Sequence, residues 1–123
     1  MKPINQSAAV HEMRLREAPF RAVASGKKTV EMRLFDEKRQ QIRVGDEILF
    51  RLDGGEASVR AVVVGLHPFP SFHELYAALI PTMGAEALGY AAGETPDPAD
   101  MLAYYPAESI ARYGVLGIEI ALR

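Results

Sequence analysis

The chain of 123 residues contains no cysteine. It therefore has no disulfides, no thiolate metal ligands and no thiol nucleophile. Such a composition fits a reducing compartment, and we expect a cytoplasmic protein. No apolar run approaches the roughly 18 residues that a transmembrane helix needs, so we expect no membrane partner. The first ten residues lack the apolar segment of a signal peptide, which predicts a flexible leader over residues 1–9 and one domain over residues 10–123.

Several catalytic and cofactor motifs are also missing. The sequence has no Walker loop, no G-x-G-x-x-G dinucleotide loop and no G-x-S-x-G nucleophile elbow. Its three histidines do not follow the H-x-H or H-x-x-x-H spacing of metal ligands. We therefore expect neither a cofactor nor a metal ion.

The chain lacks the overall basic charge that is typical of a non-specific nucleic-acid binder, since its net charge is -2. The charge is uneven, however. Residues 11–43 carry nine Lys/Arg against five Asp/Glu, whereas residues 44–123 carry four against eleven. Any contact with nucleic acid should be local, and a small anionic ligand or a single nucleotide fits this distribution equally well.

Hydrophobic periodicity predicts a short series of strands and helices. We expect strands over residues 10–16, 29–35, 48–52, 57–66 and 115–122, and helices over residues 17–25, 72–80, 97–105 and 106–113. A weaker helical stretch over residues 82–92 is interrupted by Gly84 and Gly89. Asp53-Gly54-Gly55 indicates a hairpin, while His67-Pro68 should end a strand and Pro81 should end a helix. Ser71, with Glu74 three residues later, and Asp97, followed by Pro98, should be the N-caps of two helices. The order predicts an α+β fold: a small, curved mixed sheet or partly open barrel with helices packed around it.

The segment from Gly26 to Arg33 fits the pattern G-x-K-x-x-E-x-R. Gly26 should end the first helix, and the following strand should place Glu31 and Arg33 on one face, about 7 Å apart along the chain. One interpretation is a polar pocket in which Lys28 acts as base or nucleophile, Glu31 orients it and Arg33 holds an anion. The other is purely structural: Lys28 interacts with the helix end and Glu31 pairs with Arg33.

Three further residues are candidates for ligand contact. Arg39 belongs to a basic stretch that could steer an anion toward the motif. His67 follows a strand and could line a pocket, and Tyr105, with Tyr104, could stack on a base. Each also has a simpler interpretation as a solvated charge, a loop histidine or a packing aromatic.

Residues 11–122 resemble an ASCH domain, a branch of the PUA-like superfamily. The resemblance rests on the motif and on the flanking segments Leu34–Arg39, Val44–Asp46, His67–Phe72 and Tyr113–Glu119. It implies a small β-barrel surrounded by helices, with the motif facing a cleft, and a role in binding or processing RNA.

One branch of the family is an amidohydrolase that deacetylates N-acetylated cytidine with a lysine, a threonine and a glutamate, and another is assigned ribonuclease activity. Lys28 matches the amidohydrolase lysine, whereas Glu31 occupies the position of its threonine. The resemblance thus implies that the partner is RNA, a nucleotide or a modified nucleoside. The predicted site comprises Lys28 and Glu31 as catalytic residues, and Gly26, Thr29, Arg33, Arg39, His67 and Tyr105 as ligand-binding residues.

Overall fold

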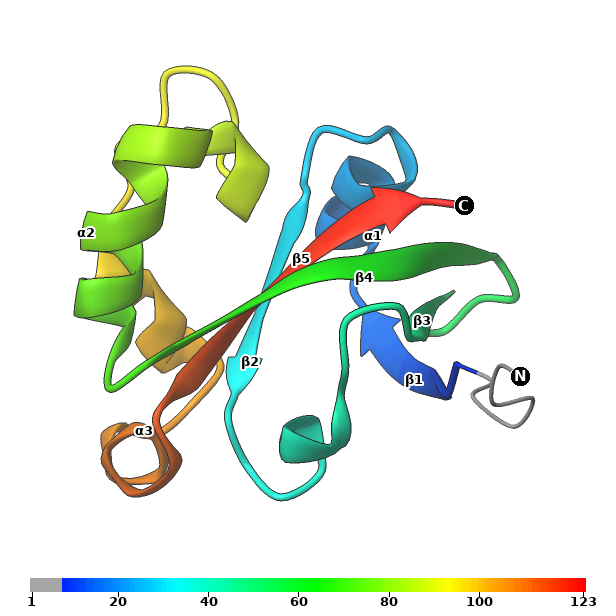
Figure 1. Ribbon diagram of the computed structural model, residues 1–123. Coiled ribbons are helices and arrows are strands. Elements are labelled where there is room, and N and C mark those ends of the chain that lie inside the picture. Colours follow the sequence, from blue (N-terminus) through cyan, green and yellow to red (C-terminus); the bar gives the residue numbers. More distant parts are fainter. Residues whose placement is uncertain (1–7) are drawn as a thin grey trace.

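A five-stranded sheet that curls into a half-barrel forms the centre of the computed structural model, which describes residues 8–123 (Figure 1). The strands are β1 (Val10–Leu15), β2 (Val30–Leu34), β3 (Glu47–Leu52), β4 (Ser58–Phe69) and β5 (Val115–Leu122). Their order in the sheet is β1-β3-β4-β5-β2, with β1 parallel to β3 and every other pair antiparallel. The predicted α+β fold with a curved mixed sheet is confirmed. Residues 1–7 of the predicted leader lie outside the described residues.

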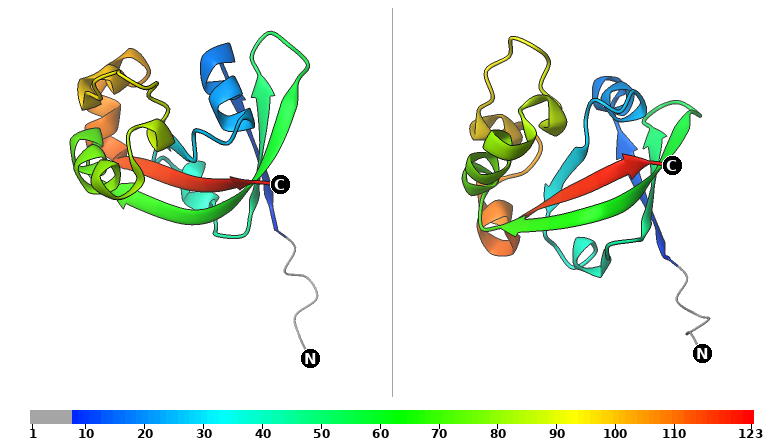
Figure 2. Two further views of the ribbon diagram at one scale, coloured as in Figure 1. Left: turned by 90° about the horizontal axis from the view of Figure 1, so that it is seen from above. Right: turned by 45° about the horizontal axis from the view of Figure 1, so that its top comes forward.

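Helices flank this sheet on two sides. They are α1 (Glu17–Ala24), α2 (Phe72–Met83) and α3 (Ala107–Tyr113), with short 3₁₀ helices η1 (Arg39–Gln41), η2 (Glu86–Leu88) and η3 (Pro98–Ala103). Figures 1 and 2 show α1 on one side of β2, and α2 with the η2–η3 segment on the other. In the part of the chain that the structure describes, no helix combines the length and hydrophobicity needed to cross a bilayer.

The local signals at the helix ends hold in the structure. Gly26 follows α1 with a φ of +81°, a conformation that glycine adopts without steric cost. The hydroxyl of Ser71 accepts a hydrogen bond from the Glu74 backbone N–H, at the start of α2. The side chain of Asp97 accepts one from the Ala99 backbone N–H, at the start of η3. Each signal is local, so the sequence suffices to predict it.

Two predicted proline breaks are wrong. β4 runs through Pro68, which pairs with Leu116 of β5. β3 pairs with β4 only as far as Val62, so no strand neighbours Pro68 on the side away from β5. On such an open edge, the missing N–H of a proline costs no hydrogen bond between strands. Pro81 lies in the last turn of α2, two residues before its end at Met83, so it removes only one late helical hydrogen bond.

The curled sheet separates two apolar cores. The first fills the half-barrel beneath α1 and the second packs β2 and β5 against α2. The first core contains Met13, Leu15, Phe20, Val23, Ile42, Ile48, Phe50, Ala61, Val63, Leu116, Ile118 and Ile120. Val30 and Met32 belong to the second core, as the alternation of β2 predicts. Glu31 pairs directly with Ile118, so the charged face of β2 points toward the half-barrel side and not into open solvent.

Candidate functional site

A buried ion-pair cluster lies where β2 begins. The Lys28 Nζ and Glu31 Oε1 atoms are 2.7 Å apart, and Arg33 Nε lies 2.7 Å from Glu31 Oε2. The side chains of Lys28, Glu31 and Arg33 are only 9, 4 and 15% exposed. Arg33 also donates from its terminal nitrogen to the backbone carbonyl of Arg14, at 3.1 Å. Both carboxylate oxygens of Glu31 are therefore engaged, and Arg33 links β2 to β1, the two edge strands of the sheet.

The backbone around the motif explains this placement. The turn at Gly26 lets the Lys28 N–H donate to the carbonyl of Ala22, and the Thr29 N–H donates to that of Ala87 in η2. The Lys28 side chain then runs past Gly89, where an added Cβ would lie 3.2 Å from Lys28 Cδ. Gly89 adopts a φ of +107° and ends η2. A residue with a side chain at this position would press on the lysine.

The electrostatics of the cluster favour a charged Glu31. Burial by itself raises the pKa of this carboxyl, but the charges and hydrogen bonds of Lys28 and Arg33 outweigh burial and hold the pKa below its usual range. An ionised carboxylate with two cationic partners orients those partners and does not readily take up a proton. Lys28 has three N–H donors and gives one to Glu31. Its other donors are the polar groups of the cluster that a ligand can use.

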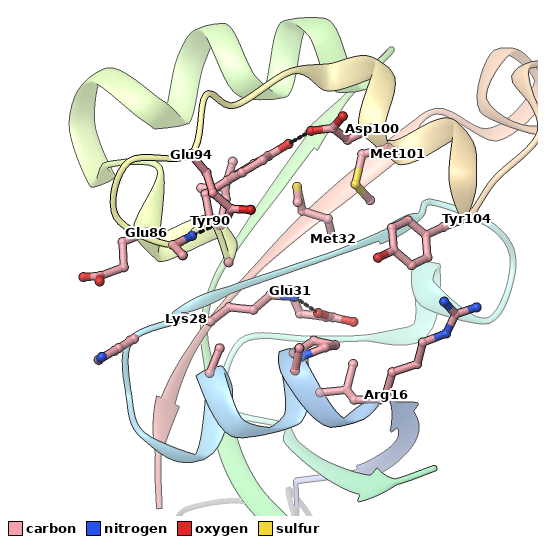
Figure 3. A pocket seen from close by; sticks show the side chains of 18 of the residues that line it. Arg16, Lys28, Glu31, Met32, Glu86, Tyr90, Glu94, Asp100, Met101 and Tyr104 are labelled. Carbon is pink, nitrogen blue, oxygen red and sulfur yellow. Dashed lines mark hydrogen bonds and ion pairs between the residues drawn. The ribbon is translucent and has the colours of Figure 1, made fainter. Parts of the chain in front are cut away.

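The cluster forms part of a cleft of about 860 Å³ between α1 and the η2–η3 segment (Figure 3). The cleft is lined by Arg14, Leu15, Arg16, Ala18, Pro19, Ala22, Lys27, Lys28, Glu31, Met32, Arg33, Asp53, Tyr76, Glu86, Leu88, Gly89, Tyr90, Ala91, Ala92, Glu94, Asp100, Met101, Tyr104 and Tyr105. One wall comes from β1 and α1, the other from α2 and the η2–η3 segment, and the motif residues lie between them. This volume lies in the range of small-molecule sites.

A chain of hydroxyl groups stiffens the helical wall. The Tyr90 hydroxyl donates to the Asp100 carboxylate at 2.8 Å, which leaves it free to accept from Tyr76 at 2.9 Å. Burial raises the pKa of the Tyr76 hydroxyl, and the bond to Tyr90 raises it further. Tyr76 and Tyr90 also meet edge to face, with ring centroids 6.0 Å apart. These contacts fix the η2–η3 segment opposite Lys28.

The structure brings together four of the eight predicted site residues. Lys28, Glu31, Arg33 and Tyr105 line the cleft. The Tyr105 ring stacks on Phe72, and burial raises the pKa of its hydroxyl.

The other four predicted residues do not line the cleft. Gly26 and Thr29 act through the backbone turn. Arg39 pairs with Asp36 at 3.1 Å. His67 lies on β4 and contacts Glu119 at 3.0 Å.

The sequence did not predict most residues of the helical wall. Gly89, Tyr90, Met101 and their neighbours lie more than 50 residues beyond the motif in sequence, and no short-range pattern joins the two segments. One signal was present: glycines at positions 84 and 89 interrupt a weak helical pattern, and Gly89 provides the space for Lys28. Arg16 gave no signal, since it is one of several exposed arginines near α1.

Comparison with known proteins finds one matching family model, the ASCH domain, over residues 13–122. The crystal structure of hypothetical protein PH0355, from Pyrococcus, is similar with a TM-score of 0.70 and 29% identity, over 93% of this chain and 99% of that chain. The solution NMR structure of protein PF0455 from Pyrococcus furiosus is similar with a TM-score of 0.67 and 29% identity, over 92% of this chain and 96% of that chain. No curated protein matches the chain.

Proposed function

Because the chain belongs to the ASCH domain family, we propose that its cleft binds a single nucleoside or nucleotide, either free or as an unpaired residue of RNA. The observation that carries the proposal is Lys28: a buried amine, oriented by Glu31, in a cleft between two walls. The general association of this family and its PUA-like fold with RNA supports the choice of ligand class. Lys28 is the principal ligand donor, and Glu31 and Arg33 position it.

The charges that line the cleft favour one nucleotide unit over a long strand. Its five basic residues are Arg14, Arg16, Lys27, Lys28 and Arg33, and its five acidic residues are Glu31, Asp53, Glu86, Glu94 and Asp100. These formal charges cancel, so the lining as a whole does not attract a polyanion. Binding of an oligonucleotide should therefore depend only weakly on salt, as expected for one or two phosphate contacts.

Isothermal titration calorimetry with cytidine, cytidine 5′-monophosphate and a short single-stranded RNA at low salt tests the proposal. We expect binding by the wild type and at least tenfold weaker binding by Lys28→Met, which removes the amine and keeps an unbranched side chain. Lys38→Met is the matched control, because Lys38 is an exposed lysine that does not line the cleft. We expect it to change the dissociation constant by about threefold or less. If none of the three ligands binds the folded wild type, the proposal is wrong.

A second candidate is an amidohydrolase that deacetylates N-acetylated cytidine, with Lys28 as base and Glu31 as its partner. The direct contact between Lys28 and Glu31 places the two groups of this candidate together, and the base role requires the Lys28 amine in its neutral form. Chromatographic detection of cytidine released from the acetylated nucleoside distinguishes catalysis from binding. Turnover by the wild type that Lys28→Met abolishes would support the enzyme. Binding without turnover would leave only the first proposal. For ribonuclease activity, the cleft offers no histidine as an acid–base group.

A further inference from the structure

Two side chains face each other across the mouth of the cleft. Arg16 precedes α1 on one wall, and Tyr104 follows η3 on the other. The guanidinium carbon of Arg16 lies 5.8 Å from the centroid of the Tyr104 ring, a cation–π contact. Figure 3 shows both side chains at the same end of the cleft, near Met32 and Met101. This contact joins elements that are otherwise separated by the open cleft.

Neither packing nor an ion pair holds these two side chains in place. Tyr104 is 57% exposed, and its hydroxyl makes no hydrogen bond within residues 8–123. Arg16 is exposed too, has no acidic partner among those residues and does not cap α1 through its side chain. Both side chains can therefore turn aside without breaking another interaction. An exposed tyrosine at a pocket mouth is instead well placed to contact a ligand.

We propose that Arg16 and Tyr104 form a clamp that holds a planar nucleobase by stacking on both of its faces. The inference deepens the proposed function and rests on it. A ring inserted between the two planes needs about 7 Å, which is two carbon–carbon contact distances. The guanidinium carbon of Arg16 now lies 5.8 Å from the centroid of the Tyr104 ring, so the two exposed side chains must rotate apart to admit a base.

The surroundings of the clamp suit a base. The thioethers of Met32 and Met101 lie beside it in the cleft, and such groups contact the edges of aromatic rings favourably. Lys28 and Glu31 lie farther along the same cleft. A base held in the clamp thus directs the rest of the nucleoside along the cleft toward the amine. Sugar and phosphate alone would gain nothing from the clamp.

A fluorescent variant tests stacking directly. The chain contains no tryptophan, so Tyr104→Trp places a single indole in the clamp. We expect cytidine 5′-monophosphate to quench its fluorescence along the same binding curve that calorimetry gives for this variant. Ribose 5-phosphate, which has the sugar and phosphate without the base, should leave the fluorescence unchanged.

Affinity measurements on further variants complete the test. Tyr104→Leu should raise the dissociation constant of cytidine 5′-monophosphate roughly 5- to 150-fold, the range for loss of one base–aromatic stack. Tyr104→Phe should change it by about twofold or less. Tyr113→Leu is the matched control: Tyr113 makes a similar contact with Arg112, at 5.0 Å, but does not line the cleft.

The outcomes separate the clamp from the proposed function. If the wild type binds cytidine 5′-monophosphate and loses affinity in Lys28→Met, yet Tyr104→Leu binds equally well and the indole is not quenched, the clamp is wrong and nucleotide binding stands. If the wild type binds no ligand that carries a base, the proposed function fails and the clamp fails with it.

Discussion

Replacing Glu31 by glutamine tests the ion-pair cluster most directly. The change keeps the size of the side chain and one acceptor oxygen, but it turns the other oxygen into an NH₂ group. One of the two cationic partners, Lys28 or Arg33, then faces a donor where it now has an acceptor 2.7 Å away. The side chains involved are at most 15% exposed, so water replaces the lost partner poorly.

The expected loss is large for a single, isosteric substitution. Removing one partner of a buried ion pair costs about 3–5 kcal/mol. We expect about 3 kcal/mol, at the low end, because glutamine retains one acceptor and Arg33 keeps its bond to the Arg14 carbonyl. For a chain of 123 residues this corresponds to a melting temperature roughly 10–15 °C lower.

Urea denaturation followed by circular dichroism measures the effect at pH 7. The midpoint should fall while the denaturant slope stays constant, which identifies a loss of native stability. Glu86→Gln serves as control, since Glu86 lines the same cleft but is exposed, and should change stability by about 0.5 kcal/mol or less. The double variant Lys28→Met/Glu31→Gln should lose at least about 1 kcal/mol less than the sum of its two single changes. A loss below about 1 kcal/mol for Glu31→Gln would refute the picture of a buried carboxylate shared by two cations.

Three other predictions concern the pKa of Glu31, the space beside Lys28 and the N-cap of α2. The pKa of Glu31 lies below its unfolded value of about 4.5, so its ionised form stabilises the fold above that pH and loses this effect as the pH falls through the folded pKa. The stability difference between the wild type and Glu31→Gln should therefore narrow below pH 5 in urea titrations, and a constant difference would contradict the assignment. Gly89→Ala should weaken cytidine 5′-monophosphate binding in calorimetry by displacing Lys28. Gly93→Ala, which also has a positive φ but no atom within 4 Å of the added Cβ, should not. Ser71→Ala should cost about 1 kcal/mol of unfolding free energy in urea, because α2 loses its N-cap, and no loss would show that the cap is dispensable.

Local chemistry made much of the fold predictable. The turn at Gly26, the cap at Ser71 and the shared face of Glu31 and Arg33 follow from backbone preference and from the two-residue period of a strand. The proline errors at positions 68 and 81 have a different origin. The disruption that a proline causes depends on whether its N–H would have had a partner and on how much helix follows it. Both depend on neighbouring strands and on the distance to the helix end, which the local sequence does not show.

The site residues were likewise predictable where they are close together in sequence, and not where they come from distant segments. The motif predicted Lys28, Glu31 and Arg33 as a group because they are close in sequence. It could not show that Glu31 faces the half-barrel, since the apolar alternation of β2 is equally consistent with a charged face in solvent. The opposite wall, from Glu86 to Tyr105, depends on contacts between distant segments and on the path of the chain after α2. Arg16 and Tyr104 are 88 positions apart, and only the folded chain brings them together.

The bond from Arg33 to the Arg14 carbonyl has a consequence for the behaviour of the protein in solution. β1 and β2 are the two edges of the sheet, and an uncovered edge is a template for pairing with a strand of another molecule. Arg33 occupies one acceptor on the edge of β1 and holds the edge of β2 beside it. A substitution that removes the hydrogen bond from Arg33 to the Arg14 carbonyl therefore exposes the sheet edges and favours aggregation. Inactive variants of Arg33 should be sought first in the insoluble fraction of the expression host.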